Sequence, residues 1–166
     1  MNKKTIRKDV LELLQRNARM SDQEIADRLQ AKPAEIKALI AEMLKDGTIL
    51  GFSTLVREDG KSGPGKVKAI IEVAVQPERD SGYDRIARAI GNFPEVRTVY
   101  LVSGKSDFQV EVVGDSLQEV AEFVAAKLSP LEGVRSTATY FLLKKYKEAG
   151  FSLTKEEKHE RLKVVP

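Results

Sequence analysis

The first residues that could take part in chemistry are a group of lysines and small side chains between Lys32 and Ala38. Pro33 suits the first position of a helix, so these side chains are expected near the leading end of that helix. Lysines there can neutralise phosphates, and small side chains let a helix lie deep in the major groove of duplex DNA. The candidate DNA contacts are Ser21, Lys32, Ala34, Glu35, Lys37 and Ala38.

Composition excludes several other kinds of chemistry. The chain of 166 residues has no cysteine and a single histidine, His159. Disulfide scaffolds, thiolate metal sites and cysteine nucleophiles are therefore excluded. One histidine cannot build a His-based catalytic triad or a multi-histidine metal site within one subunit. We expect no enzyme, no metal and no cofactor, and the net charge of +3 permits a nucleic-acid partner without requiring one.

A second polar group lies in the short connection from Gly104 to Asp107. It places glycine, serine and aspartate between two strongly apolar stretches. This pattern predicts a hairpin at the edge of a sheet. If the protein forms dimers, a second dimer could close a pocket over this hairpin. Turns use these same residue types. In the alternative interpretation, Asp107 only stabilises the turn by accepting backbone N–H bonds.

Three short helices are expected to position the first group. They cover residues 6–16, 21–29 and 33–46. Ser21 and Glu24 form a capping box at the start of the second helix, and a tight turn before Pro33 predicts a helix-turn-helix. A generic three-helix bundle is the alternative. Residues 48–56 are rich in β-formers and predict a strand.

The rest of the chain is expected to form a second domain. Residues 57–66 have three glycines, Pro64 and no hydrophobic periodicity, as is typical of a linker. Strand and helix patterns then alternate as βαββαβ, the ferredoxin-like unit. The predicted elements are strands at 67–75, 96–103, 108–114 and 134–144, and helices at 81–92 and 116–128, capped by Ser81 and by a Ser116–Glu119 capping box. The expected fold class is α+β, with domains 1–56 and 67–146 followed by a charged tail, 147–166.

One face of the predicted sheet has no helices to cover it. That face is expected to carry Ile70, Ala74, Val113 and either Phe141 or Leu142, depending on register. An open apolar face usually marks an association surface, so we hypothesise that two copies pair through their sheets.

This order of elements resembles the leucine-responsive and asparagine-synthase regulator family (Lrp/AsnC) of transcription factors. Three stretches carry the resemblance: residues 6–52, which end in Gly47-Thr48-Ile49-Leu50-Gly51-Phe52, the hairpin 102–108, and the entry to the last strand, 133–139. Their order and spacing are together fairly specific. The resemblance implies a winged-type helix-turn-helix domain, a ligand-binding ferredoxin-like (RAM-type) domain, and a regulator that binds double-stranded DNA.

The resemblance also implies a small-molecule effector. Members of the family dimerise through the C-terminal domain, often assemble into octamers, and bind amino acids between dimers near the hairpin. On that analogy, the effector-binding residues are Gly104, Ser106, Asp107, Ser136 and Thr137. An aspartate can accept from an α-ammonium group, and backbone N–H groups and hydroxyls can hold an α-carboxylate.

The sequence departs from the family at the recognition helix. Leu39 stands where many members carry an arginine, and it fits the apolar stripe, so we interpret it as a core residue. Glu35 and Glu42 on the same helix weaken attraction to phosphate. A ligand-binding module with little DNA affinity is therefore an alternative function. An enzyme similar to the haem-pathway decarboxylases is a further alternative. It is disfavoured because the chain's only histidine is outside the expected fold.

The two ends of the chain carry little specific information. The start is basic, at Lys3-Lys4 and Arg7-Lys8, but Glu12 breaks any signal-peptide apolar region. No apolar run approaches the roughly 18–20 residues of a membrane span. A cytoplasmic chain with no membrane partner is expected. The tail from residue 147 is expected to be a mobile or partly helical terminus, and packing on a neighbouring subunit is the functional alternative.

Overall fold

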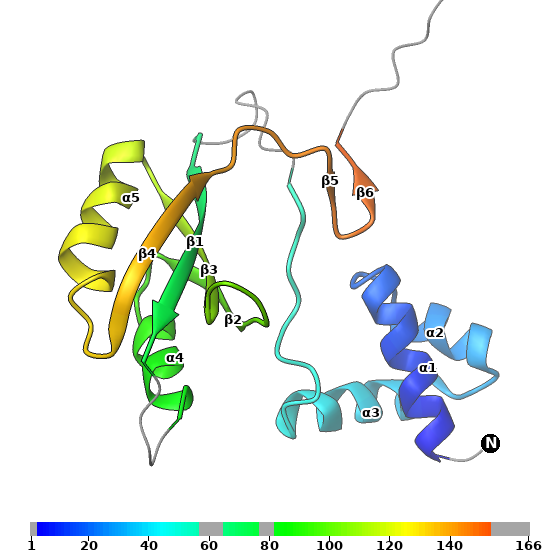
Figure 1. Cartoon of the computed structure of the whole chain (residues 1–166). Helices are drawn as coiled ribbons and strands as arrows, with labels where there is room; N and C mark the ends of the chain where they lie inside the picture. Colours follow the sequence, from blue (N-terminus) through cyan, green and yellow to red (C-terminus); the bar gives the residue numbers. More distant parts are fainter. Residues whose placement is uncertain (1–2, 57–64, 77–81, 154–166) are drawn as a thin grey trace, which may run out of the picture. The chain divides into compact units, whose positions relative to one another are not determined.

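The computed structural model describes residues 3–56, 65–76 and 82–153. The chain divides into two compact units, residues 1–56 and 57–166 (Figure 1). Each unit has its own apolar core, so each is described by itself.

The first unit consists of three helices, which confirms the predicted order. They are α1 (Lys3–Arg16), α2 (Asp22–Leu29) and α3 (Pro33–Lys45). The capping box is confirmed: the Ser21 hydroxyl accepts from the Glu24 N–H at 3.2 Å, and the Glu24 carboxylate accepts from the Ser21 N–H at 2.8 Å. Pro33 begins α3, where a missing N–H costs nothing. The buried core is Val10, Leu14, Ile25, Ala26, Ile36, Leu39, Met43 and Ile49.

The predicted strand at residues 48–56 is wrong. No strand forms among the described residues of this unit, and Leu50 is 96% exposed. Only the start of the segment is fixed, because the Ile49 N–H donates to the Met43 carbonyl at 2.9 Å. Side chains that favour strands do not make one without a neighbouring backbone to pair with.

The second unit confirms the predicted βαββαβ order. Its elements are β1 (Val67–Val75), α4 (Asp84–Gly91), β2 (Val96–Leu101), β3 (Phe108–Gly114), α5 (Leu117–Phe123), which continues as the π-helical turn η1 (Val124–Leu128), and β4 (Val134–Phe141). The four strands pair antiparallel in the order β2-β3-β1-β4. Helices α4 and α5 cover one face of this sheet (Figure 1). The core against them comprises Ala69, Ile71, Val73, Val75, Ile86, Ile90, Phe108, Val110, Val112, Val120, Phe123 and Leu128.

The register settles which side chains lie on the open face. Phe141 pairs with Ala69 and so lies on the helix-covered side, whereas the Leu142 N–H donates to the Lys68 carbonyl at 2.9 Å and continues the open side. The same alternation places Glu72 and Glu111 on the open face. That face is therefore more polar than the sequence pattern suggested.

Two helix caps differ from the prediction. Helix α4 begins at Asp84 with Tyr83 at its N-cap, so the expected cap by Ser81 is wrong in position, and Ser81 is outside the described residues. At α5, the Ser116 hydroxyl accepts from the Glu119 N–H at 3.1 Å as expected. The Glu119 carboxylate, however, accepts from the Asp115 N–H rather than from Ser116. A carboxylate three residues into a helix can reach either preceding N–H group.

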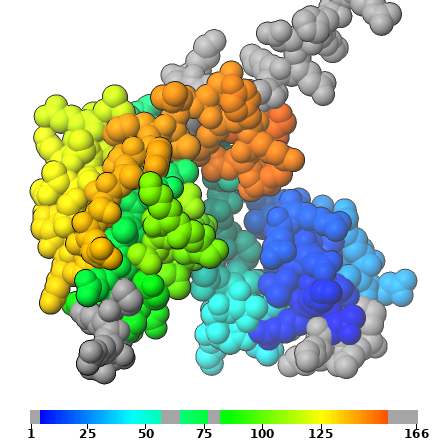
Figure 2. Space-filling model, viewed as in Figure 1, coloured from blue at the N-terminus to red at the C-terminus, as the bar shows by residue number. Residues whose placement is uncertain are grey.

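The start of the charged tail forms a small hairpin that was not predicted. Strands β5 (Lys147–Glu148) and β6 (Phe151–Ser152) pair antiparallel. Ala149 and Gly150 between them have φ of 43° and 88°, the left-handed geometry of a tight hairpin turn. Residues 154–166, including His159, are outside the described part of the chain. Strand β4 is an edge of the main sheet and lies beside α5 at the molecular surface, orange against yellow in Figure 2.

Candidate functional site

Helix α3 presents most of the candidate DNA contacts on its solvent side. Ile36, Leu39 and Met43 face the core, and Leu39 is only 7% exposed, which confirms that it is a core residue. The candidates Ser21, Lys32, Ala34, Glu35, Lys37 and Ala38 are all exposed. At about 3.6 residues per turn, Ala41 and Lys45 continue the face of Ala34 and Ala38, and both are exposed. These two residues were not among the predicted contacts, although their helical spacing from Ala34 indicates them.

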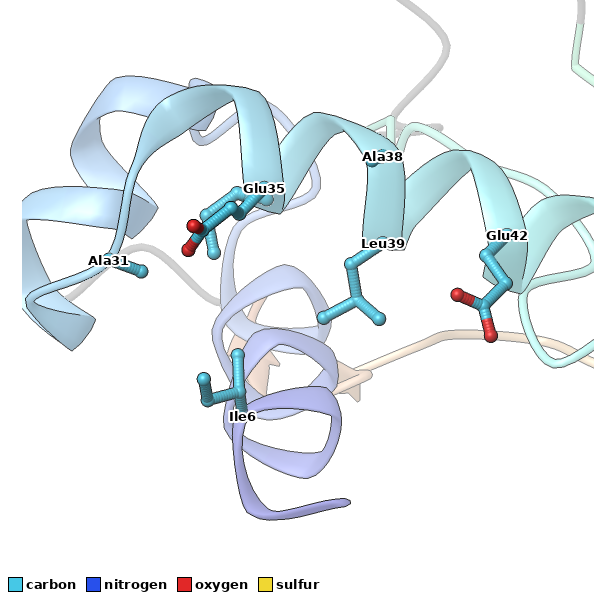
Figure 3. Close-up of a pocket in the computed structure, with 7 residues that line it drawn as sticks. Ile6, Ala31, Glu35, Ala38, Leu39 and Glu42 are labelled. Atoms are coloured by element: carbon cyan, nitrogen blue, oxygen red, sulfur yellow. The ribbon is translucent and has the colours of Figure 1, made fainter. Parts of the chain in front are cut away.

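The acidic residues of α3 lie on one flank of the helix. Figure 3 shows Leu39 and Ile6 pointing toward each other, with the carboxylates of Glu35 and Glu42 on either side of Leu39. These side chains, with Ala31 and Ala38, line a groove of about 350 Å³ between α1 and α3. The two glutamates therefore adjoin the alanine face at Ala38, which lines the same groove.

Arg7 of α1 neutralises acidic groups at the C-terminal end of α3. Its guanidinium donates to Glu42 at 3.3 Å, to the Thr48 hydroxyl at 2.7 Å and to Asp46. Hydrogen bonds from the Thr48 hydroxyl, Arg7 and the Thr48 N–H lower the pKa of Asp46 to about 2, and Asp46 in turn raises the pKa of Arg7. This network reduces the repulsion that Glu42 and Asp46 would exert on DNA phosphates.

The hairpin from Gly104 to Asp107 is confirmed as a tight turn, since the Val102 N–H donates to the Asp107 carbonyl at 2.9 Å. One oxygen of the Asp107 carboxylate accepts from the Val75 N–H at 2.8 Å, and the other accepts from the Tyr83 hydroxyl at 3.2 Å. Asp107 accepts that hydrogen bond and carries a negative charge, and both effects raise the pKa of Tyr83. Asp107 thus ties the hairpin to the end of β1 and the start of α4. Its oxygens keep further lone pairs for a ligand.

The other proposed effector residues lie at the same end of the sheet. Ser136 and Thr137 pair with Ala74 and Val73, and the Asp107 N–H donates to the Val73 carbonyl at 3.1 Å from the other side of β1. Successive strand residues point to opposite faces. Thr137 accordingly lies 3.3 Å from the Ser129 hydroxyl in the helix layer, and Ser136 faces the open side. One pocket on one face cannot use both hydroxyls.

A metal site and a membrane-spanning helix were also sought among the described residues. Residues 3–56, 65–76 and 82–153 hold no group of three or more His, Cys, Asp or Glu side chains that could bind a metal ion. No helix among the described residues is both long and apolar enough to cross a bilayer.

Comparison with known families gives one match in each unit. Residues 3–49 match the winged helix-turn-helix DNA-binding family. Residues 68–150 match the Lrp/AsnC ligand binding domain.

Individual proteins show the same relationship. The uncharacterized HTH-type transcriptional regulator YugG of Bacillus subtilis is 38% identical over 161 residues, which cover 95% of each chain. A transcriptional regulator of Neisseria meningitidis, solved with L-methionine, has a TM-score of 0.67 at 22% identity and covers 89% of this chain and 93% of its own. The leucine response regulatory protein of Mycobacterium tuberculosis has a TM-score of 0.71 at 16% identity, covering 93% and 100%. These two structures establish the fold. The two family matches, together with the similarity to YugG, establish the family: the chain belongs to the Lrp/AsnC family of helix-turn-helix transcriptional regulators.

Proposed function

We propose that this regulator acts in the cytoplasm as a homodimer, binds duplex DNA through α3, and changes its DNA binding or assembly when an amino acid binds near the Gly104–Asp107 hairpin. The observation that carries the proposal is the pairing of an exposed, lysine-flanked α3 with a separate Lrp/AsnC ligand binding domain. None of these steps requires a catalytic group, and we propose no enzymatic activity.

The DNA contacts follow from the exposed face of α3. Lys32 and Lys37 are placed to neutralise phosphates, and Ala34 and Ala38 let the helix approach the base edges. Glu35 is exposed on the flank and can accept from a cytosine amino group. Ser21 is a weaker candidate, because its hydroxyl both accepts from the Glu24 N–H and donates to the Glu24 carboxylate.

The effector is proposed to be an amino acid. The fold neighbours include a regulator solved with L-methionine and a leucine response regulatory protein. In this chain, Asp107 is proposed to accept from the ligand ammonium, Gly104 to allow close backbone approach, and Ser106 and Ser136 to offer hydroxyls. Gly104 has a φ of 153°, which L side chains rarely adopt. Thr137 is proposed to contribute only from a neighbouring subunit, since its own face is the helix layer.

Assembly is proposed to use the open sheet face. It combines apolar side chains, among them Ile70 and Tyr140, with Glu72, which accepts from the Tyr140 hydroxyl at 3.4 Å. Isologous pairing would bury these groups against their copies. An octamer built from such dimers is the further expectation of the family resemblance.

The substitution Asp107→Asn tests the effector proposal. Asparagine is nearly isosteric and keeps an oxygen for the Val75 N–H, so the unliganded protein should lose at most about 1 kcal/mol of stability. Loss of a charge-assisted bond to a ligand ammonium should weaken binding about 10- to 100-fold. Calorimetric titration of each of the twenty amino acids, with thermal melting of both unliganded proteins, measures the two effects separately. Unchanged affinity together with a lowered melting point would assign Asp107 to the turn alone.

A binding module with little DNA affinity is the second candidate function. It is favoured by the composition of α3, which has no arginine, asparagine or glutamine for bidentate base contacts. Salt dependence separates the two. A regulator that contacts phosphates releases counterions and gives a steep fall of log K with log salt, whereas a module without DNA contacts gives no shift of duplex DNA at any salt.

A further inference from the structure

The groove between α1 and α3 in the first unit has room for a small molecule. Its volume of about 350 Å³ lies in the range of about 300–1,000 Å³ that is usual for small-molecule sites. Two of its lining residues, Ala31 and Ala38, have side chains too small to fill the space between the two helices. The groove is therefore a consequence of the local sequence.

The middle of this groove is apolar. Leu39 of α3 points toward Ile6 of α1 (Figure 3), and Ile36 lines the groove as well. Leu39 and Ile36 are buried, so they form a floor that side-chain motion does not remove. A hydrocarbon chain lying across Ile6 and Leu39 would take their remaining apolar surface out of water, which favours binding.

A carboxylate stands on either side of this apolar floor (Figure 3). Glu35 and Glu42 are two helical turns apart, about 10 Å along α3. Among the described residues, no hydrogen bond or ion pair engages the Glu35 carboxylate. Arg7 donates to one oxygen of Glu42 at 3.3 Å, and because a carboxylate has about four lone-pair sites, Glu42 can accept from a second cation.

We propose that this groove binds an aliphatic diamine. One ammonium group pairs with Glu35, the other pairs with Glu42, and a chain of about five methylenes covers Leu39 and Ile6 between them, with the glutamate side chains making up the rest of the roughly 10 Å. Two cations joined by an apolar chain match two carboxylates separated by an apolar floor. An α-amino acid fits poorly, because its own carboxylate would be repelled by the glutamates.

The position of the groove gives the diamine a consequence for DNA binding. Glu35 and Ala38 line the groove and are also candidate DNA contacts. A bound dication would neutralise carboxylates beside the phosphates and so strengthen DNA binding. This consequence rests on the proposed function, whereas diamine binding itself does not.

The test is a titration of the full chain without DNA, observed by NMR of isotope-labelled isoleucine and leucine methyl groups. The probe is 1,5-diaminopentane, and it should shift the Ile6 and Leu39 signals to saturation. Pentylamine lacks the second charge and should bind at least about 10-fold more weakly. At equal ionic strength, 1,2-diaminoethane carries both charges but cannot span both glutamates, and it should also bind more weakly.

Two pairs of variants locate the site. Glu35→Gln keeps the side-chain shape and should raise the Kd for 1,5-diaminopentane about 10- to 100-fold. Its control is Glu12→Gln, which removes a carboxylate of α1 that pairs with Lys8 at 3.6 Å and should leave the Kd unchanged. Ala38→Leu fills the groove at an exposed position, whereas Ala41→Leu adds the same side chain to α3 outside the groove lining. Helices tolerate leucine nearly as well as alanine, so both should fold, as melting can verify, and only Ala38→Leu should weaken binding.

Three results would overturn the proposal: no shift of the Ile6 and Leu39 signals by 1,5-diaminopentane, equal affinity for pentylamine, or an unchanged Kd in Glu35→Gln. Each of these leaves the proposed DNA contacts and amino-acid response standing, because neither DNA nor an amino acid is present in the titration.

Discussion

Gly133 controls how α4 packs on the sheet, and Gly133→Ala should destabilise the second unit strongly. Its φ is 90°, a conformation that costs an L side chain about 1–2 kcal/mol. An added Cβ would lie 2.6 Å from the Cδ1 atom of Ile86. Ile86 is only 2% exposed, so it cannot swing into solvent, and overpacking of this kind costs about 1–3 kcal/mol.

The two contributions together predict a loss of about 2–5 kcal/mol in the free energy of unfolding. That is a large part of the roughly 5–15 kcal/mol that a domain has. Urea unfolding measures it as a lowered midpoint at unchanged slope. Gly104→Ala is the control for backbone strain alone, since its φ is 153° and a Cβ there meets nothing within 4 Å.

A double-mutant cycle isolates the steric part. Ile86→Val removes the Cδ1 atom and costs about 0.5–1.5 kcal/mol by itself. The atom nearest the new Cβ is then Cγ1, at an ordinary 3.5 Å. Gly133→Ala combined with Ile86→Val should be less destabilising than the sum of the two by about 0.5–3 kcal/mol. Strict additivity, or a Gly133→Ala loss no larger than that of Gly104→Ala, would refute the reasoning.

Three further predictions concern charge. Replacing Lys32 and Lys37 by Ala removes four lysines from a homodimer. It should weaken DNA binding about equally across sequences and reduce the slope of log K against log salt by about 4, measured by fluorescence anisotropy; an unchanged slope removes both lysines from the phosphate contacts. Because the pKa of Asp46 is about 2, below its ordinary 3.8, its stabilisation is full above about pH 4 and is lost as pH falls through about 2; Asp46→Asn should abolish this component of acid unfolding, and an identical pH profile would contradict it. The pKa of the Tyr83 phenol, which Asp107 raises, should fall in Asp107→Asn. Ultraviolet titration measures it, with Tyr83→Phe as the blank, and an unchanged pKa would contradict the hydrogen bond.

Local rules predicted the elements well where short-range chemistry decides them. The Ser21–Glu24 capping box and the start of a helix at Pro33 each depend on residues that are close in sequence, and both predictions are confirmed. The strand predicted from the alternating pattern at Val67–Val75 is also confirmed, because alternate side chains of that strand are buried. The strand predicted at 48–56 does not form, because a strand requires a pairing partner and no local pattern supplies one.

Long-range contacts account for what the sequence could not reveal. Arg7 reaches Glu42 and Asp46 across 35 and 39 residues, and nothing in its neighbourhood indicates that pairing. The hydrogen bond from Tyr83 to Asp107 spans 24 residues and gives the hairpin carboxylate a structural partner that turn statistics do not specify.

We propose that amino-acid binding to the second unit alters DNA binding by the first. The direct measurement is anisotropy titration of the full chain against a duplex obtained by in vitro selection, alone and with each of the twenty amino acids at saturating concentration. Typical coupling free energies of about 1–3 kcal/mol predict an affinity change of about 5- to 150-fold, or a changed stoichiometry on the same duplex. Tight, salt-dependent DNA binding that is identical with and without every one of the twenty amino acids would contradict the account.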